Sequence, residues 1–130
     1  MSWQAYVDDT LVKSGHLDKA AILSLDGTST WATTAGFQVS AEEGKALASI
    51  LTTDAGKEAV WANGFHVGGE RFVVTKAEGR SLYGRQGREG VCIVKTAQTL
   101  IVGHYGESHV AGNTANVVEK LADYLISLKY

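Results

Sequence analysis

Residues 65–105 read FHVGGERFVVTKAEGRSLYGRQGREGVCIVKTAQTLIVGHY, and this stretch decides the fold. It contains five short runs rich in β-branched and aromatic residues, which are typical of strands. The runs are separated by turn signals at Gly68-Gly69, Glu78-Gly79, Gln86-Gly87 and Ala97-Gln98. Because these turns leave no room for crossover helices, consecutive strands must pair antiparallel, as a meander.

Two further elements precede the meander. Residues 20–34 predict a hairpin, since AAILSL and WATT flank the turn sequence DGTST. Ser40 with Glu43 three residues later is the capping-box pattern, and it predicts a helix over residues 40–53. We expect DAGKEA, residues 54–59, to be a loop.

Both ends of the chain predict helices. Ser2 is a candidate N-cap, and apolar or aromatic residues at spacings of three and four follow it, which indicates an amphipathic helix of about three turns. A second helix is expected from about Thr114 to Leu128, with an apolar stripe of Val117, Val118, Leu121, Leu125 and Leu128. The fold class is therefore α+β, an antiparallel sheet whose faces are covered by helices.

Composition predicts one ordinary globular domain, residues 1–130. The chain is 130 residues long and 45% hydrophobic, enough for one substantial core. No apolar run approaches the roughly 20 residues that a membrane span needs, and Asp8 and Asp9 near the N-terminus do not fit a signal peptide. Cys92 is the only cysteine, which fits a reducing compartment, so we expect a cytoplasmic protein.

Charge is unevenly distributed along the chain. The net charge is −2, with −4 on residues 1–60 and +2 on residues 61–130. Six basic side chains lie between residues 71 and 95, which could attract an acidic partner. Nothing in the overall charge predicts binding to nucleic acid.

Catalytic patterns are missing from the sequence. Cys92 lies in the apolar run GVCIV, where a thiol is typically a small buried hydrophobe. The four histidines occupy separate turns or strand ends, so we expect each at the surface or at a sheet edge. The glycines of GFHVGGERF open no helix and are followed by no Lys-Ser/Thr pair, so they form no phosphate loop. We expect no enzyme, no cofactor and no metal.

Binding patterns are present at the two ends of the chain. Trp3, Tyr6, Tyr124 and Tyr130 lie in the terminal segments, and together with Trp31 they could converge if the terminal helices pack side by side. Flat rings with N–H and O–H donors suit a proline-rich segment in the polyproline II conformation, which offers apolar rings and free carbonyls. The alternative is that Trp3, Tyr6 and Trp31 only anchor the core.

The sequence also resembles a known family. SWQAYVDD at the start, WATTAGF around Trp31, AEGRSLYGR, and NVVEKLADYLISLKY at the end are similar to profilin, of the amoeboid and fungal type, from Ser2 to Tyr130. The resemblance implies a seven-stranded antiparallel sheet with both terminal helices on one face and smaller helices on the other. It also implies a protein that binds actin monomers and links them to proline-rich ligands at the cytoskeleton.

The resemblance implies three sets of contact residues. The poly-proline set is Trp3, Tyr6, Trp31, Tyr124, Leu125 and Tyr130. The actin set, on the side opposite to the proline-rich ligand, is Arg71, Val74, Lys76, Arg80, Arg85, Lys95, Gly112, Asn113 and Lys120. The phosphoinositide set, for head groups at a membrane surface, is Arg71, Arg80, Arg85 and Arg88.

One alternative function stays open at this point. An antiparallel sheet with flanking helices is also the plan of cytosolic small-molecule sensor domains, and a fold does not determine a function. A sensor would need an interior cavity under the sheet, whereas a peptide receptor needs exposed aromatic side chains.

Overall fold

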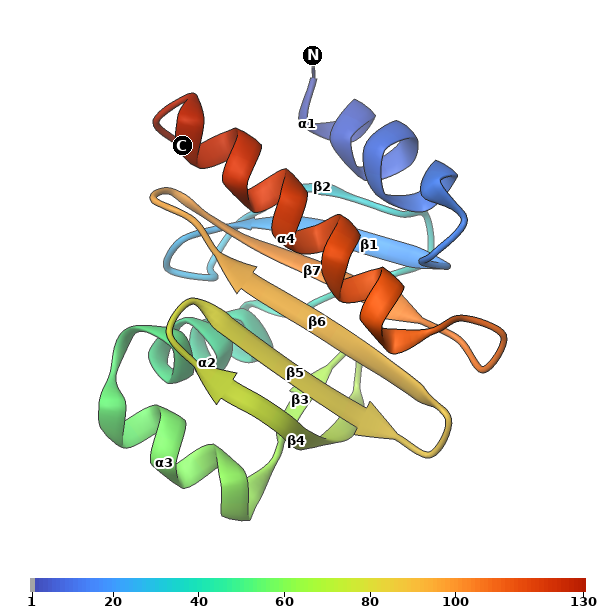
Figure 1. Ribbon diagram of the computed structural model, residues 1–130. Helices are drawn as coiled ribbons and strands as arrows, with labels where there is room; N and C mark the ends of the chain where they lie inside the picture. Colours follow the sequence, from blue (N-terminus) through green and yellow to red (C-terminus); the bar gives the residue numbers. More distant parts are fainter. Residues whose placement is uncertain (1) are drawn as a thin grey trace.

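A computed structural model describes residues 2–130, and its centre is a single antiparallel sheet with strand order β2-β1-β7-β6-β5-β4-β3. The meander predicted from residues 65–105 is confirmed, and the hairpin of residues 20–34 adds the last two strands at the β7 side (Figure 1). The strands are β1 Lys19–Ser24, β2 Thr30–Thr33, β3 Phe65–Val67, β4 Glu70–Glu78, β5 Ser81–Gln86, β6 Glu89–Lys95 and β7 Thr99–Tyr105.

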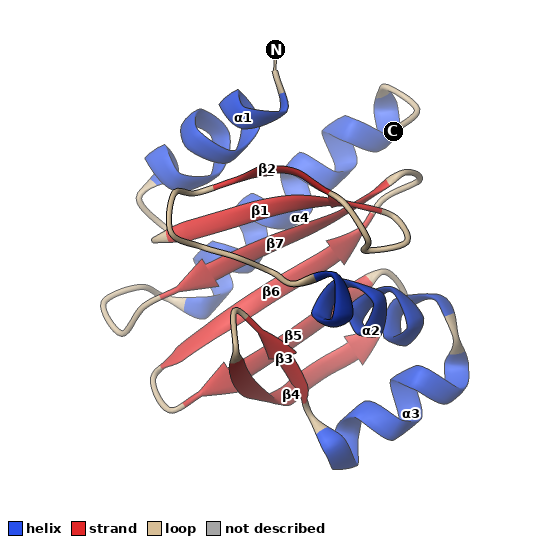
Figure 2. Ribbon diagram, turned by 180° about the vertical axis from the view of Figure 1, so that it is seen from behind, coloured by secondary structure: helices blue, strands red, loops and turns tan. Residues whose placement is uncertain are grey.

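Helices cover both faces of the sheet. The N-terminal helical segment and α4 (Ala111–Ser127) lie on one face, and α2 (Ala41–Thr52) and α3 (Asp54–Asn63) lie on the other (Figures 1 and 2). This is the arrangement that the resemblance implied. Across residues 2–130, no helix is both long enough and apolar enough to span a membrane.

The N-terminal helix forms as predicted but is not a regular α-helix. Ser2 caps it, since its Oγ accepts the Ala5 N–H at 3.1 Å. One α-helical turn, α1 (Trp3–Ala5), leads into the wider i→i+5 turns of η1 (Tyr6–Leu11) and then the 3₁₀ turn η2 (Val12–Ser14). In the wider turns, residues five apart share a face, so Tyr6 and Leu11 both point at the sheet and both are buried.

The predicted loop at residues 54–59 was wrong, because α3 occupies this segment. The side chain of Thr53 caps the helix by accepting the Gly56 N–H at 3.0 Å. Only Val60 is buried along the whole helix, so the sequence carries almost no amphipathic signal there. Gly56 permits the tight corner after α2, since a Cβ at this position would lie 2.7 Å from the Ser49 carbonyl oxygen.

Two apolar cores form, one on each face of the sheet. The core under α2 and α3 contains Leu47, Phe72 and Leu100, and the core under the terminal helices contains Leu11, Val118 and Leu125. β7 lies between β1 and β6 and has a core on each of its faces, so all of its residues are buried.

His104 lies on β7, so it is buried rather than at the surface or an edge as predicted. Its Nδ1 lies 2.6 Å from a carboxylate oxygen of Asp18. This neighbour explains how a polar ring is tolerated at a central strand.

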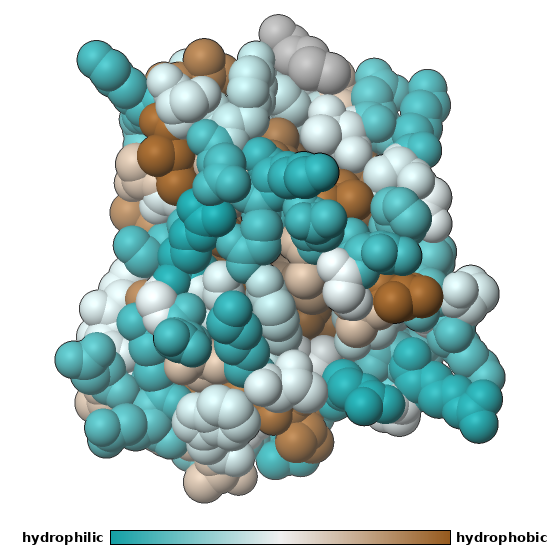
Figure 3. All heavy atoms as spheres, in the orientation of Figure 1, coloured by the Kyte–Doolittle hydropathy of each residue, from teal (hydrophilic) through white to brown (hydrophobic). Residues whose placement is uncertain are grey.

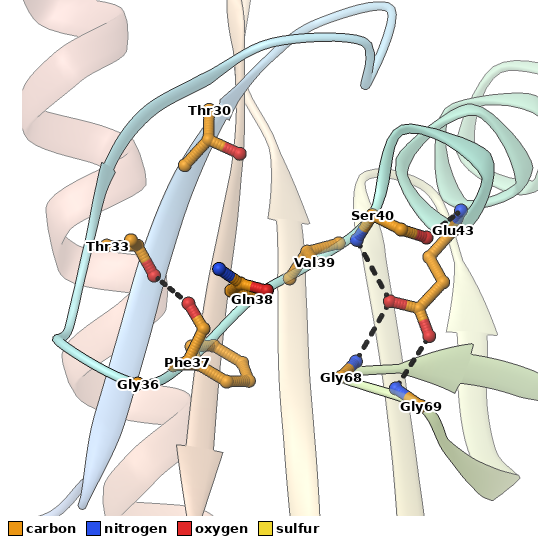
Figure 4. A pocket seen from close by; sticks show the side chains of 10 residues that line it. All are labelled: Thr30, Thr33, Gly36, Phe37, Gln38, Val39, Ser40, Glu43, Gly68 and Gly69. Atoms are coloured by element: carbon orange, nitrogen blue, oxygen red, sulfur yellow. Dashed lines mark hydrogen bonds between the residues drawn. The ribbon is translucent and has the colours of Figure 1, made fainter.

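The start of α2 is fastened to both edges of the sheet. The predicted capping box is present, and the Glu43 carboxylate also accepts the N–H groups of Gly68 and Gly69 in the β3–β4 turn (Figure 4). The β1–β2 turn meets the same helix through two glycines, since a Cβ on Gly44 would lie 1.9 Å from the Gly27 carbonyl oxygen. The Glu43 carboxylate and the close glycine contact together hold the start of α2 against the sheet.

Candidate functional site

Five aromatic side chains from the two ends of the chain and from β2 form one cluster, here called the aromatic cluster: Trp3, Tyr6, Trp31, Tyr124 and Tyr130. Trp3 is at its centre, with ring centroids 5.0 Å from Trp31, 5.2 Å from Tyr130 and 5.7 Å from Tyr6. Tyr6 continues the cluster to Tyr124 at 6.2 Å. The structure therefore brings together all five aromatic residues predicted for the poly-proline site.

The members of this set differ in how much surface they offer. Tyr124, Tyr130 and Trp31 are 51%, 40% and 37% exposed. These three side chains are therefore not part of the buried core. Tyr6 is buried, so it offers a ligand much less surface than these three side chains do. Leu125 is fully buried in the core under α4 and supports the cluster from beneath, so its predicted role as a direct contact does not fit.

Hydrogen bonds to backbone carbonyls fix the position of Tyr130 and join the N-terminal helix to β2, the strand that carries Trp31. The chain turns back after α4, where Lys129 adopts a φ of 69°, and the Tyr130 N–H donates to the Leu125 carbonyl at 2.9 Å. The Tyr130 carbonyl accepts the Thr96 hydroxyl at 2.9 Å, which ties the C-terminus to the β6–β7 turn. On the other side, Gln4 Nε2 donates to the carbonyl of Thr33 at 3.0 Å and so joins the N-terminal helix to β2.

The chemistry of the aromatic cluster suits a flat, donor-poor ligand. Burial, with a smaller effect from neighbouring Tyr124, raises the pKa of Tyr6, so this hydroxyl stays a neutral donor at physiological pH. Indole and phenol rings tilted at 55° to 89° to one another present several faces and edges. Such faces pack against proline rings while the N–H and O–H groups donate to ligand carbonyls.

A second surface lies on the outer half of the sheet beside the N-terminal end of α4. Along β4, Phe72 and Val74 point into the core under α2 and α3, so the predicted actin contact Val74 is buried. Its neighbour Val73 points the other way and is 56% exposed. Sequence reasoning missed Val73, although the alternation Phe72, Val73, Val74 carries the signal.

A β-bulge changes the direction of the rest of β4. The register shifts between Val74 and Lys76, so that Lys76 pairs with Tyr83. The Lys76 ammonium lies 5.2 Å from the Tyr83 ring centroid, on the face that α4 covers. Without this bulge, strand alternation would place Lys76 on the same face as Val74.

The structure brings together only part of the predicted actin set. Arg85 pairs with Val73 across β4 and β5, so these two share the face with Lys76. Gly112 and Asn113 are exposed in the first turn of α4, beside this face, and Lys120 is exposed further along the helix. We name this surface the strand face and define it by Val73, Lys76, Arg85, Gly112 and Asn113.

Lys95 lies apart from the strand face. It pairs with Leu100, which belongs to the core under α2 and α3, so it points away from α4. Trp61 on α3 is 54% exposed and is a further large apolar side chain that the sequence analysis did not single out.

The four arginines predicted for phosphoinositides do not form one cluster. Arg71 and Arg85 lie toward the β5–β6 turn with Arg88, whereas Arg80 precedes β5 at its opposite end. β5 has six residues and is about 20 Å long, so its length separates Arg80 from the other three arginines. Two of the four also have acidic partners: Arg80 contacts Glu119 and Asp123, each at 2.9 Å, and Arg88 contacts Glu107 at 2.9 Å.

Glu119 links α4 to the sheet beneath the strand face. Its carboxylate accepts hydrogen bonds from the hydroxyls of Ser81, at 2.6 Å, and Tyr83, and from Arg80 Nε at 3.0 Å. Burial alone would raise the pKa of this carboxyl, but these donors together outweigh it and lower the pKa. Glu119 therefore fixes how α4 sits on β5, and α4 belongs to both binding surfaces.

A hollow away from the aromatic cluster does not resemble a sensor cavity. It has a volume of about 710 Å³ and lies between segment 34–40 and the β3–β4 turn (Figure 4). The only carboxylate lining it, Glu43, is already saturated by the N–H groups of Ser40, Gly68 and Gly69. Beneath the sheet, side chains such as Phe72, Leu82 and Ile93 are fully buried and fill the core.

Hydropathy over the face that carries α4 agrees with two limited binding surfaces. Polar side chains cover most of this face, and smaller apolar areas lie between them (Figure 3). No single broad apolar area dominates this view.

Comparison with known proteins assigns the family. The profilin family model matches residues 1–130. Profilin-2 of Acanthamoeba castellanii is 51% identical over 97% of each chain. The crystal structure of Schizosaccharomyces pombe profilin is 40% identical, covers 99% of this chain and all of its own, and superimposes with a TM-score of 0.94. A mouse profilin IIa, solved in complex with a double repeat from the FH1 domain of mDia1, is 24% identical and has the same fold, with a TM-score of 0.80 and complete coverage of both chains.

This chain belongs to the profilin family. Both the sequence matches and the superposition extend over nearly the full chain, so the terminal helices that carry the aromatic cluster are part of the shared fold.

Proposed function

We propose that this protein binds actin monomers through the strand face and proline-rich segments through the aromatic cluster, and so regulates actin polymerisation. The observation that carries the proposal is the partly exposed aromatic cluster at the junction of both chain ends. Family membership supports it, and so does the mouse profilin that is solved with an FH1 repeat. The role is one of binding without catalysis, in the cytoplasm and at the cytoskeleton.

The two surfaces are separate, which permits both ligands to bind together. The aromatic cluster joins the N-terminal helix, β2 and the C-terminal end of α4, whereas the strand face joins β4, β5 and the N-terminal end of α4. Basic side chains on the strand face would speed encounter with an acidic partner. An interface of standard size, roughly 1,600 Å² in total, would supply the affinity for actin.

Poly-proline binding is tested by Trp3→Ala. Trp3 touches three other members of the cluster, so its loss removes the central ring face and should weaken binding to decaproline at least tenfold. The matched control is Trp61→Ala, which removes an exposed tryptophan on α3 and should leave binding unchanged. Calorimetric titration measures the affinity, and circular dichroism checks that both variants are folded. Equal decaproline affinity in Trp3→Ala and the wild type would refute the assignment.

Actin binding is tested by charge and polarity changes on the strand face. Arg85→Glu and Val73→Asp should each weaken binding to monomeric actin tenfold or more while decaproline affinity stays the same. Lys95→Glu is the control, because Lys95 points to the opposite face of the sheet. If Lys95→Glu weakened actin binding more than Arg85→Glu did, actin would use a different surface.

A phosphoinositide role is proposed only for the arginines near the β5–β6 turn, beside the strand face. Arg71, Arg85 and Arg88 lie toward the same end of the sheet, whereas Arg80 is engaged by Glu119 and Asp123. Arg85→Glu with Arg88→Glu should therefore reduce binding to vesicles that contain phosphoinositides more than Arg80→Glu does. The reverse order would contradict this division.

A further inference from the structure

The chain reverses direction after α4, and this reversal carries the ring of Tyr130 onto Trp3. The Lys129 N–H donates to the Ile126 carbonyl at 2.9 Å, and the Tyr130 N–H donates to the Leu125 carbonyl at 2.9 Å. These two bonds are those of a Schellman motif, in which the residue at the turn adopts a left-handed backbone conformation and is usually glycine. The reversal therefore determines where the Tyr130 ring lies against Trp3, at 5.2 Å between centroids.

Lys129 does not favour this reversal by itself. Its φ is 69°, and within residues 2–130 it is the one non-glycine residue with a positive φ. A residue with a Cβ pays for this left-handed conformation in steric energy, whereas glycine does not. Contacts with other segments must therefore help to stabilise the reversal.

The turn between β6 and β7 supplies these contacts. The Thr96 hydroxyl donates to the Tyr130 carbonyl at 2.9 Å, and the Gln98 backbone N–H donates to the same carbonyl. The Gln98 side-chain amide donates to the Lys129 carbonyl at 3.1 Å. The turn is itself closed by the Thr96 N–H, which donates to the Thr99 carbonyl at 2.9 Å. Three hydrogen bonds thus join the turn to the reversal.

Thr99 orients the hydroxyl of Thr96. A hydroxyl has one proton to donate and two lone pairs that accept. The Thr96 oxygen accepts the Thr99 N–H at 3.1 Å and lies 2.6 Å from the Thr99 hydroxyl oxygen. When the Thr99 hydroxyl donates across this contact, both lone pairs of Thr96 are used and its proton points to the Tyr130 carbonyl. The other acceptor within reach, the Thr99 carbonyl, lies farther away at 3.5 Å.

We propose that Thr96, oriented by Thr99 and assisted by Gln98, is a positioning residue for poly-proline binding, because it holds the Tyr130 ring in the aromatic cluster. The proposal rests on the proposed poly-proline function and adds to it residues that act through Tyr130. Thr96 and Thr99 are buried, so water does not compete for their hydrogen bonds. A ring that is already in place loses less conformational entropy when a ligand binds, which raises the affinity.

The experiment measures decaproline affinity by calorimetric titration in three variants of the turn. Thr96→Val keeps the shape of threonine but removes the donor, and it should weaken binding about three- to tenfold, the equivalent of one hydrogen bond. Thr96→Ser keeps the hydroxyl and should bind as the wild type does. Gln98→Ala removes only the side-chain amide, at an exposed position, and should weaken binding about twofold.

Two comparisons separate positioning from a general loss of stability. Thr114 is also a buried threonine whose hydroxyl donates to a backbone carbonyl, that of His16 at 2.6 Å, but it lies at the opposite end of α4. Thr114→Val should lower the Tm much as Thr96→Val does and leave decaproline affinity unchanged. In a Tyr130→Ala background, Thr96→Val should cause no further loss of affinity, because the side chain that it positions is gone.

Each result decides a distinct claim. Wild-type affinity in folded Thr96→Val would overturn the positioning role and leave the poly-proline function standing. A loss that persists in the Tyr130→Ala background, or an equal loss in Thr114→Val, would overturn it as well. If Thr96→Val does not fold, Gln98→Ala decides: a loss of affinity that Tyr130→Ala removes supports the proposal, and wild-type affinity refutes it. If the wild type does not bind decaproline, the poly-proline function fails, and the positioning role fails with it.

Discussion

Replacing Glu119 should destabilise the protein more than any other single charge removal on α4, because this carboxylate accepts hydrogen bonds from three donors on or beside β5. A hydrogen bond to a charged group contributes about 1.5–3 kcal/mol. Glu119 is 23% exposed, so water replaces part of what is lost, and Arg80 keeps its second partner, Asp123. We therefore expect Glu119→Ala to lower the free energy of unfolding by about 2–4 kcal/mol.

The same value can be read as a change in melting temperature. With an unfolding entropy of about 2.1 cal/mol/K per residue, the loss corresponds to a fall in Tm of about 7–15 °C for a chain of 130 residues. Urea denaturation at pH 7 measures the free energy, and scanning calorimetry measures the Tm. Glu107→Ala is the control, since Glu107 and Arg88 form an exposed pair whose loss should cost less than about 1 kcal/mol.

The pH dependence gives an independent check on Glu119. Its pKa in the folded protein is below the ordinary value of 4.5, so its stabilising effect is fully present above that value. The effect is lost as the pH falls through the folded pKa, and the stability difference between the wild type and Glu119→Gln should shrink correspondingly. A Glu119→Ala variant within 0.5 kcal/mol of the wild type at pH 7, or a difference that grows as pH falls, would refute the reasoning.

Three further predictions concern packing and reactivity. Gly44→Ala should destabilise the protein by about 1–3 kcal/mol although alanine favours helices, since its Cβ would lie 1.9 Å from the Gly27 carbonyl oxygen; an unchanged or higher Tm would contradict this. Cys92 is buried, which raises its pKa to about 12, so the native protein should react with a thiol reagent far more slowly than the urea-unfolded chain; equal rates would mean that the thiol is accessible. Leu125 is fully buried, so Leu125→Ala should lower the free energy of unfolding by about 2–5 kcal/mol. Tyr124 is exposed, so Tyr124→Ala should weaken decaproline binding with little change in Tm. A large fall in Tm for Tyr124→Ala and none for Leu125→Ala would contradict this division.

The sequence by itself determined the elements whose signals are local. Short turns at Gly68-Gly69 and Gln86-Gly87 leave antiparallel pairing as the only option for the strands that they join, and the meander follows. Ser2 and Ser40 mark the helix starts because a side-chain cap needs only the next three residues. The five aromatic residues of the cluster were singled out by their positions in the terminal segments and in the second hairpin strand, and the family motifs favoured binding over core anchoring.

Only the tertiary structure decided which way particular side chains point and which of them are buried. The bulge after Val74 places Lys76 on the strand face, and a bulge depends on pairing with a distant strand. The burial of His104 and Leu125 depends on which elements pack over them. Helix α3 is stabilised by a cap and a tight corner rather than by an apolar stripe. The contact between the β1–β2 turn and α2 likewise depends on two distant segments, since Gly27 and Gly44 leave no mark in the sequence that they meet.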